Sequence, residues 1–233
     1  MTTSARHPHL VSTIESTIDT AIFDLGGVLM LNGRHRDLVR RFPPEHADAA
    51  LRVFVGDYAT DGDHPWHRLE RGEITMGEFR TLSQSAFEAA GIPPLPTPPE
   101  PEAGEAPKPM IAFEPNEAML DLVRRLREVG VRTGMLTNNV KEFRDAWRGL
   151  MPWHELFDDI VDSHEVGLRK PNPAIYHLAA TRLKTDPSRA VFLDDVASNV
   201  EAARSIGMTG VVVDEDSAPA IAEVNRLFGL TGA

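Results

Sequence analysis

The chain has 233 residues, of which 42% are hydrophobic and 25% charged, as expected for a soluble globular protein with a substantial core. Its net charge of −11 argues against a general nucleic-acid binder, because such proteins neutralise phosphates with Lys and Arg. The absence of cysteine excludes a disulfide, a thiolate nucleophile and a cysteine-ligated zinc site. No apolar run is long enough to cross a membrane, and Met1 to Asp19 lacks a signal-peptide core, so we expect a cytoplasmic protein.

The first predicted strand ends at a carboxylate. Residues 1–19 show no helical or strand period, and we expect a loosely held extension or an expression remnant. The apolar run from Thr20 to Phe23 then predicts a buried strand with Asp24 at its tip. Gly26 and Gly27 follow, and glycines let the backbone turn sharply and approach a ligand. Asp24 is therefore a candidate site residue, although Asp before Gly is also common at ordinary turns.

A helical insert is predicted next. From Arg34 onward, apolar residues recur at three- and four-residue spacings. These residues are Leu38, Val39, Phe42, Ala49, Leu51, Val53, Phe54, Ile74, Phe79, Leu82 and Phe87. Thr75 and Glu78 have the spacing of a capping box at the start of the last helix. The proline-dense, acidic stretch 93–109 favours an extended loop or linker, while a polyproline ligand for a partner is the less common use.

Helices and strands alternate through the second half of the chain. Helices are predicted over 117–129, from 142 to 147, and over 173–183, 198–206 and 218–228. Strands are predicted over 131–136, 159–163, 190–193 and 209–213. This alternation implies right-handed crossovers and therefore an α/β fold with a Rossmann-like parallel sheet. In such sheets ligands bind beyond the carboxyl ends of the strands.

Three predicted strands end in polar groups that we expect to meet at one sheet edge. They are Asp24, Thr137 with Asn138, and Asp194 with Asp195. Neighbouring carboxylates repel one another unless they are protonated or bridged by a cation. Oxygen ligands without His or Cys favour Mg²⁺. The alternative for Asp194 and Asp195 is a solvated turn.

Two further groups suit an anionic ligand. Lys170 lies in the segment from Leu168 to Pro173, where prolines stiffen the approach to a helix. A lysine held there could offset the charge of both a carboxylate and a bound phosphate, although alone it would be taken for a surface lysine. The Thr137 hydroxyl and the backbone N–H groups after it form a candidate anion cradle, although Thr-Asn-Asn is equally typical of a loop.

The polar segments resemble, in order and spacing, the four motifs of the haloacid dehalogenase-like (HAD) hydrolases. The matching segments are 24–28, 137–138, 170–171 and 192–195. The resemblance covers about residues 20–215, and segments 71–75 and 192–208 are most similar to the branch with the soluble epoxide hydrolase phosphatase domain and bacterial sugar-phosphate phosphatases. It implies a HAD core formed by 20–33 and 112–233, with an α-helical cap at 34–111 inserted after the first strand.

The resemblance also implies an activity: a Mg²⁺-dependent phosphatase that acts on a small phosphorylated metabolite through an aspartyl-phosphate at Asp24. The implied metal ligands are Asp24, the Gly26 carbonyl and Asp195, supported by Asp194 and Asn199. The implied groups around the phosphoryl oxygens are Thr137, Asn138 and Lys170. This assignment is chemically coherent, because attack by a carboxylate on phosphorus requires its charge repulsion to be cancelled.

One position departs from the family pattern. Most phosphatases of the family carry a second Asp two residues after the nucleophile, whereas this chain has Gly26. General acid–base assistance is worth about 10²–10⁴-fold, which predicts slow turnover or a preference for good leaving groups such as acyl or anomeric phosphates. A Gly26→Asp change is expected to raise turnover if the missing acid is the limitation. His64 or His67 could replace it, and Trp66 beside them either lines the substrate pocket or anchors the cap.

Two alternatives to a phosphatase are open at this stage. A metal-free 2-haloacid dehalogenase would use Asp24 to displace halide, but the Asp194 and Asp195 pair disfavours it because repulsion would weaken the attack. A catalytically weak HAD-fold binding or regulatory protein is the other, and Gly26 is its motivation.

Overall fold

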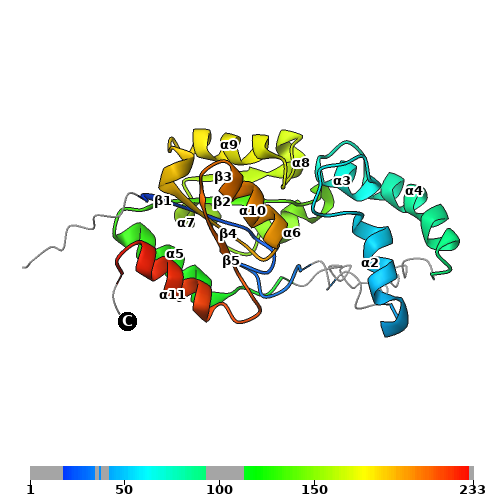
Figure 1. Cartoon of the computed structure of the whole chain (residues 1–233), viewed down its shortest axis with the longest axis horizontal. Coiled ribbons are helices and arrows are strands. Elements are labelled where there is room, and N and C mark those ends of the chain that lie inside the picture. The colour runs from blue at the N-terminus through cyan, green and yellow to red at the C-terminus, as the bar shows by residue number, and fades with distance from the viewer. Residues whose placement is uncertain (1–17, 35–36, 38–41, 93–112, 231–233) are drawn as a thin grey trace, which may run out of the picture.

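The computed structural model describes residues 18–34, 37, 42–92 and 113–230. Five parallel strands form one sheet in the order β3-β2-β1-β4-β5 (Figure 1). The strands are β1 (Thr20–Phe23), β2 (Arg132–Thr137), β3 (Asp159–Asp162), β4 (Ala190–Asp194) and β5 (Thr209–Val212). The predicted α/β fold class with a parallel sheet is confirmed, and β1 lies at its centre.

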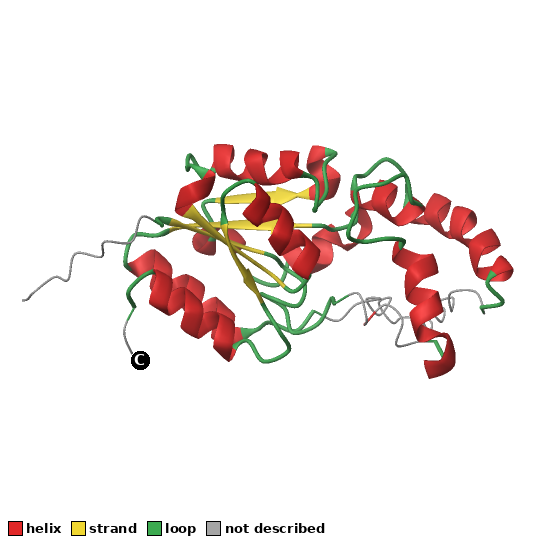
Figure 2. Cartoon of the chain, viewed as in Figure 1, coloured by secondary structure: helices red, strands yellow, loops and turns green. Residues whose placement is uncertain are grey.

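Helices cover both faces of the sheet (Figure 2). One face packs against α5 (Glu117–Glu128), α7 (Trp153–Leu156) and α11 (Ala218–Leu227), and the other against α9 (Pro173–Arg182) and α10 (Ala197–Ser205). Successive strand residues point to opposite faces, so Ala21 and Phe23 join the first core while Ile22 joins the second. Burial on both sides explains why the inner strands β1 and β4 are mainly apolar and fully buried.

The long predicted elements lie within one or two residues of their observed bounds, but several short helices were not predicted. The helix expected from 142 consists of a 3₁₀ turn, η2 (Lys141–Phe143), followed by α6 (Arg144–Arg148). The unpredicted elements are η1 (Pro44–His46), α3 (Pro65–Glu70), α7, α8 (Ser163–Val166) and η3 (Pro187–Arg189). Elements of three to six residues contain too few positions for a period to be visible.

The helical insert, which we define as the described residues 42–92, supplies most of a third hydrophobic cluster, which Val140 after β2 also joins. It contains α2 (Ala47–Val55), α3 and α4 (Met76–Ala89). The rings of Phe54, Trp66 and Phe79 pack with centroids 4.7 to 5.4 Å apart. This third cluster is therefore distinct from the two at the sheet, but the insert shares it with the segment that follows β2.

Helix α4 begins at the predicted capping box. Thr75 Oγ1 accepts a hydrogen bond from the Glu78 backbone N–H, and Glu78 Oε2 accepts one from the Thr75 N–H. Leu82, one of the apolar residues whose spacing predicted this helix, lies on α4 but is 47% exposed. The buried face runs along Phe79, Ser83 and Phe87 at four-residue intervals, and Leu82 falls beside it.

Some predictions fall largely outside the described residues: the extension over 1–19, the proline-rich loop over 93–109 and the helical positions Leu38 and Val39. The division into core and cap at 33/34 and 111/112 stays a prediction.

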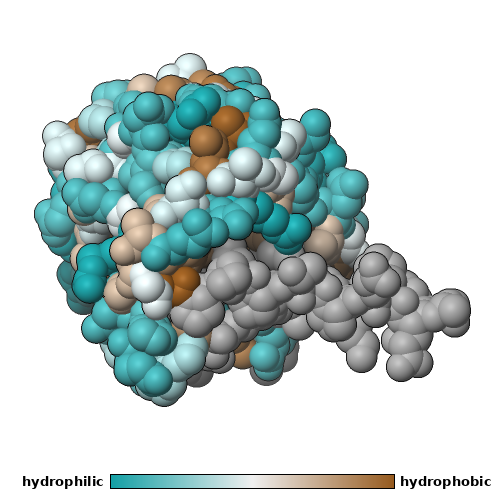
Figure 3. Space-filling view, turned by 90° about the vertical axis from the view of Figure 1, so that its right-hand side faces the viewer, coloured by the Kyte–Doolittle hydropathy of each residue, from teal (hydrophilic) through white to brown (hydrophobic). Residues whose placement is uncertain are grey.

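No helix in the described part of the chain is long and apolar enough to cross a membrane. On the side of the molecule that carries the insert, hydrophobic side chains are scattered over a mainly hydrophilic surface (Figure 3).

Candidate active site

Three carboxylates meet at the carboxyl edge of the sheet. Asp24 follows β1, Asp194 ends the neighbouring strand β4, and Asp195 follows it. The Asp24 N–H donates to the Leu193 carbonyl at 2.9 Å, which extends the pairing of the two strands to their tips. One oxygen of each carboxylate lies within 4.8 Å of the others. Side chains separated by 170 residues of sequence are thus brought together by the sheet.

Lys170 bridges two of these carboxylates. Its Nζ lies 2.8 Å from Asp24 Oδ1 and 2.7 Å from Asp194 Oδ2, and it donates to the Leu136 carbonyl at 3.0 Å. Burial acts to lower the pKa of Lys170, but the charges of Asp194 and Asp24 outweigh it and raise that pKa. The amine is therefore a permanent cation within the site.

The site carries more negative charge than Lys170 neutralises. Burial raises the pKa of Asp24 from 3.8 to about 7; Lys170 opposes this rise and Asp194 adds to it. Burial also raises the pKa of Asp195 to about 8, and the charges of Asp194 and Asp24 add to the effect. Lys170 divides its charge between two carboxylates, so the group as a whole favours another bound cation.

These oxygens fit the ligand preference of Mg²⁺, which binds carboxylates and water rather than His or Cys. Asp194 is the most occupied of the three, because it accepts hydrogen bonds from Lys170, from the Val196 N–H and from Asn199 Nδ2. Asp24 and Asp195 are accordingly the better candidates for direct ligands. Asp194, held by Asn199, suits a supporting position.

Gly27 lets Asp195 approach the loop after β1. Its φ is +71°, and a Cβ there would lie 2.8 Å from the Asp195 carboxylate carbon and 2.9 Å from Arg34 Cγ. Arg34 Nη1 lies 3.3 Å from Asp195 Oδ2, while its Nη2 donates to the carbonyls of Gly27 and Asp214 at 2.9 Å. Arg34 is thus a second cation of the site. Sequence reasoning missed it because nothing in the local pattern points to Asp195.

The loop after β1 leaves little room for a side chain at position 26. A Cβ at this position would lie 2.9 Å from the Gly33 carbonyl oxygen. That oxygen belongs to the main chain and cannot rotate away as a flexible side chain would. The loop from Gly26 to Gly33 therefore closes over the place that a side chain at position 26 would need.

We expect Gly26→Asp to destabilise the protein by roughly 1–3 kcal/mol, because the new Cβ overpacks against the Gly33 carbonyl. The gain in turnover expected from sequence alone is accordingly not expected in this chain. Urea denaturation and turnover measurements would test this. Gly77→Asp is a matched control, since a Cβ there meets only Thr75 Oγ1 at 3.8 Å and position 77 lies in the first turn of α4. Stability equal to that control, with faster turnover, would contradict the expectation.

The Asn138 side chain holds Lys170. Its Oδ1 accepts from the Lys170 N–H at 2.8 Å, and its Nδ2 donates to the Lys170 carbonyl at 2.9 Å and to the Tyr58 hydroxyl at 3.0 Å. Thr137, at the end of β2, is 2% exposed. The amide therefore positions the lysine, a role that the sequence pattern did not reveal. The phosphoryl contacts of Thr137 and Asn138 stay predictions.

The histidines considered as substitutes for the missing acid are engaged inside the insert. His64 Nδ1 accepts from the Trp66 N–H at the start of α3, and His67 Nδ1 accepts from the Gly62 N–H. Burial, followed by the charge of Arg169, lowers the pKa of His67 to about 4. Trp66 is buried against Phe54 and Phe79, which fits an anchor.

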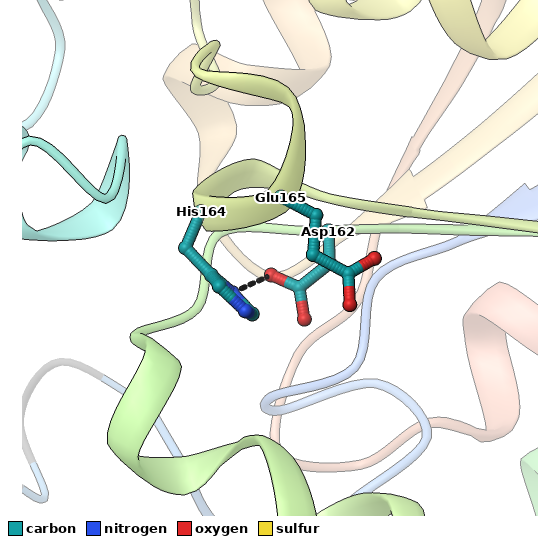
Figure 4. Close-up of side chains that lie close together, drawn as sticks. All are labelled: Asp162, His164 and Glu165. Atoms are coloured by element: carbon teal, nitrogen blue, oxygen red, sulfur yellow. Dashed lines mark hydrogen bonds and ion pairs between the residues drawn. The ribbon is translucent and has the colours of Figure 1, made fainter.

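A second group of potential metal ligands follows β3 (Figure 4). Asp162 Oδ1 lies 2.7 Å from His164 Nδ1, and both side chains are almost fully buried. Glu165 is held by Arg144 and Arg148, at 2.8 and 3.0 Å. Each acid here already has a basic partner: Asp162 is hydrogen-bonded to His164, and the Glu165 ion pairs tie α8 to α6.

The fold and the site together define the class of protein. It is an α/β protein whose parallel sheet carries a cluster of aspartates and a lysine at its carboxyl edge, where ligands bind in such sheets. A family model described as haloacid dehalogenase-like hydrolase matches residues 18–207. The chain therefore belongs to the haloacid dehalogenase-like hydrolases, as its motifs predicted.

Individual proteins and structures are similar over most of the chain. Bifunctional epoxide hydrolase 2 of Mus musculus is 31% identical over 90% of this chain, which spans 38% of that protein. A sesquiterpene phosphatase of Aspergillus oryzae is 28% identical, with 92% of this chain and 98% of that protein covered. A HAD family enzyme from Bacteroides thetaiotaomicron, crystallised with magnesium and inorganic phosphate, has a TM-score of 0.56 at 20% identity over 85% of this chain and 96% of that chain. The structural likeness shows the shared fold.

Proposed function

We propose that this chain is a Mg²⁺-dependent phosphatase that acts on a small phosphorylated molecule. The observation that carries the proposal is the meeting of Asp24, Asp194 and Asp195 at the carboxyl edge of the sheet, where Lys170 bridges the first two. The proposal is further supported by a relative that is named a phosphatase and matches nearly end to end.

In this proposal Asp24 is the nucleophile. A carboxylate oxygen attacks phosphorus, the bond from phosphorus to the leaving oxygen breaks, and an aspartyl-phosphate forms. Water then attacks the same phosphorus, releasing inorganic phosphate and restoring the Asp24 carboxylate. Lys170 holds the Asp24 side chain in place and offsets negative charge as the phosphoryl group arrives.

Asp24, Asp195 and the Gly26 carbonyl are the proposed Mg²⁺ ligands, with Asp194 and Asn199 in support. When bound, the ion supplies positive charge that offsets repulsion between the carboxylates and the phosphoryl oxygens. With no side chain at Gly26 to protonate the leaving oxygen, we expect acyl or anomeric phosphates to react faster than alkyl phosphates. The helical insert is proposed to serve as the cap over the site.

The proposal is tested by measuring hydrolysis of p-nitrophenyl phosphate and acetyl phosphate with Mg²⁺ and with EDTA. We expect Mg²⁺-dependent turnover on both compounds. Halide release from a 2-haloacid that persists in EDTA would identify the metal-free dehalogenase instead. Failure on a broad panel of phosphorylated metabolites would favour a binding or regulatory protein.

Metal binding is expected to depend on pH in a defined direction. The folded-state pKa values of Asp24 and Asp195, about 7 and about 8, lie above the ordinary value of 3.8, so the folded metal-free protein binds more protons than the unfolded chain. As far as these two groups are concerned, the free energy of unfolding should therefore be greatest below pH 3.8. It should fall steadily as pH rises from 3.8 and level off above the folded-state values of about 7 and about 8. Mg²⁺ takes the place of those protons and should stabilise the protein more at pH 8 than at pH 5.

Thermal unfolding in MgCl₂ and in EDTA at the two pH values measures this effect. At a Mg²⁺ concentration 100 times Kd, the stabilisation should be about 2.7 kcal/mol. Asp195→Asn is the control, because it removes one proposed ligand and should abolish most of the shift. Equal shifts at pH 5 and pH 8, or none at either, would contradict the proposed ion site.

A further inference from the structure

A buried polar network joins the helical insert to the sheet beside the site. At its centre, the Glu70 side chain is 2% exposed. Its Oε1 accepts hydrogen bonds from the Tyr58 hydroxyl and from Trp66 Nε1, both at 2.9 Å. Its Oε2 accepts from Arg169 Nε at 2.8 Å, and the Arg169 side chain is fully buried. A buried ion pair of this kind is geometrically demanding, because its members must keep their hydrogen bonds to offset lost hydration.

This network reaches the segment that carries Lys170 by two routes. Arg169 is its sequence neighbour, and Arg169 Nη1 donates to the Thr60 carbonyl of the insert at 2.6 Å. The Asn138 side chain accepts a hydrogen bond from the Lys170 N–H and donates one to the Lys170 carbonyl. It also donates to the Tyr58 hydroxyl at 3.0 Å. The Arg169 guanidinium carbon lies 4.6 Å from the centre of the Tyr58 ring. Tyr58 therefore contacts both routes.

The position of Lys170 is sensitive to such support. Its ammonium must lie 2.8 Å from Asp24 and 2.7 Å from Asp194 at the same time, and 1% of the side chain is exposed. A displacement of about 1 Å in a catalytic constellation can cost about 10²-fold in rate. Burial, followed by the charge of Glu70, raises the pKa of Tyr58 well above its ordinary value. The Tyr58 hydroxyl thus stays protonated as a hydrogen-bond partner, and we assign it no acid–base role.

We infer that Tyr58 is a positioning residue: its hydroxyl, acting through Asn138, transmits the placement of the helical insert to Lys170. The packing of the insert against the Lys170 segment and the placement of the lysine are then coupled. The consequence for catalysis rests on the proposed phosphatase function. The consequence for the structure does not.

The test compares two variants that each remove one donor to the same Glu70 oxygen. Tyr58→Phe removes the hydroxyl that also meets Asn138, whereas Trp66→Phe removes an indole N–H that acts only within the insert. We expect Tyr58→Phe to lower kcat for acetyl phosphate about 10-fold while KM changes less than about twofold, and Trp66→Phe to lower Tm with kcat within about twofold. Equal effects of the two variants on kcat would overturn the inference.

A double-mutant cycle isolates the route through Asn138. In an Asn138→Ser background the Tyr58 hydroxyl has lost its link to Lys170, so adding Tyr58→Phe should change kcat by less than about twofold. Additive effects of the two substitutions would overturn the assignment of that route.

Hydrogen exchange provides a measurement that does not depend on enzyme activity. The Lys170 amide donates to Asn138 Oδ1, so its exchange should be faster in Tyr58→Phe and unchanged in Trp66→Phe. Unchanged exchange in Tyr58→Phe would overturn the inference, whether or not the protein hydrolyses phosphates. Absence of hydrolysis in the unmodified protein would refute the proposed function alone, and exchange at Lys170 would still decide the structural coupling.

Discussion

Replacing Asp24 with asparagine is expected to lower phosphate hydrolysis by about 10⁴-fold or more, because a carboxamide is too poor a nucleophile to attack phosphorus. Asparagine keeps the shape of the side chain and an oxygen that can accept from Lys170 Nζ, which lies 2.8 Å away in the native protein. It also removes a buried carboxyl group whose raised pKa shows that its charge is costly in this environment. The fold should therefore be retained. Turnover and thermal unfolding, measured on the same preparation, check both expectations.

Asp162→Asn is a matched control for this substitution. Asp162 is also a buried aspartate at the end of a strand of the same sheet, but it pairs with His164 outside the three-carboxylate group. Its replacement should leave the turnover of the folded protein within about twofold, because it contacts none of the proposed reacting groups. Activity that survives Asp24→Asn would refute the nucleophile assignment, and equal losses in both variants would point to a general loss of structure.

Lys170→Met is expected to remove activity and to destabilise the metal-free protein by about 3–5 kcal/mol at pH 8. The substitution leaves the carboxylates of Asp24 and Asp194 buried without their shared cation. The penalty should shrink at pH 5, because the pKa of Asp24, about 7, lets its carboxyl group take up a proton there. Urea denaturation in EDTA at the two pH values measures the difference.

Lys170→Arg separates charge from geometry. A guanidinium keeps the positive charge but is larger and planar, and it cannot reproduce a point charge held close to two carboxylates and the Leu136 carbonyl. We expect this variant to recover part of the lost stability and little of the lost turnover. Full stability of Lys170→Met at pH 8 would show that Lys170 does not balance the buried carboxylates.

Much of the sheet and part of the site could be predicted from local pattern alone. The apolar runs mark strands buried on both faces, and the alternation with helices requires them to be parallel. Parallel strands end at one edge, which is why Asp24 and Asp194 could be paired although 170 residues separate them. The capping box at Thr75 and Glu78 could also be predicted, because both of its hydrogen bonds lie within four residues of sequence.

Other features were decided by tertiary packing, since no local pattern encodes them. The strand order, with β1 between β2 and β4, depends on how the strands and helices pack together. The exposure of Leu82 likewise depends on how α4 packs within the insert. Arg34 finds Asp195 across 161 residues, and Glu70 finds Arg169 across 99. Sequence by itself thus determined which residues end the strands. Only the tertiary structure decided which cations and which tyrosine surround those strand-end residues. Ion pairs and hydrogen bonds between distant segments depend on distances that are fixed only once the sheet and the insert have packed.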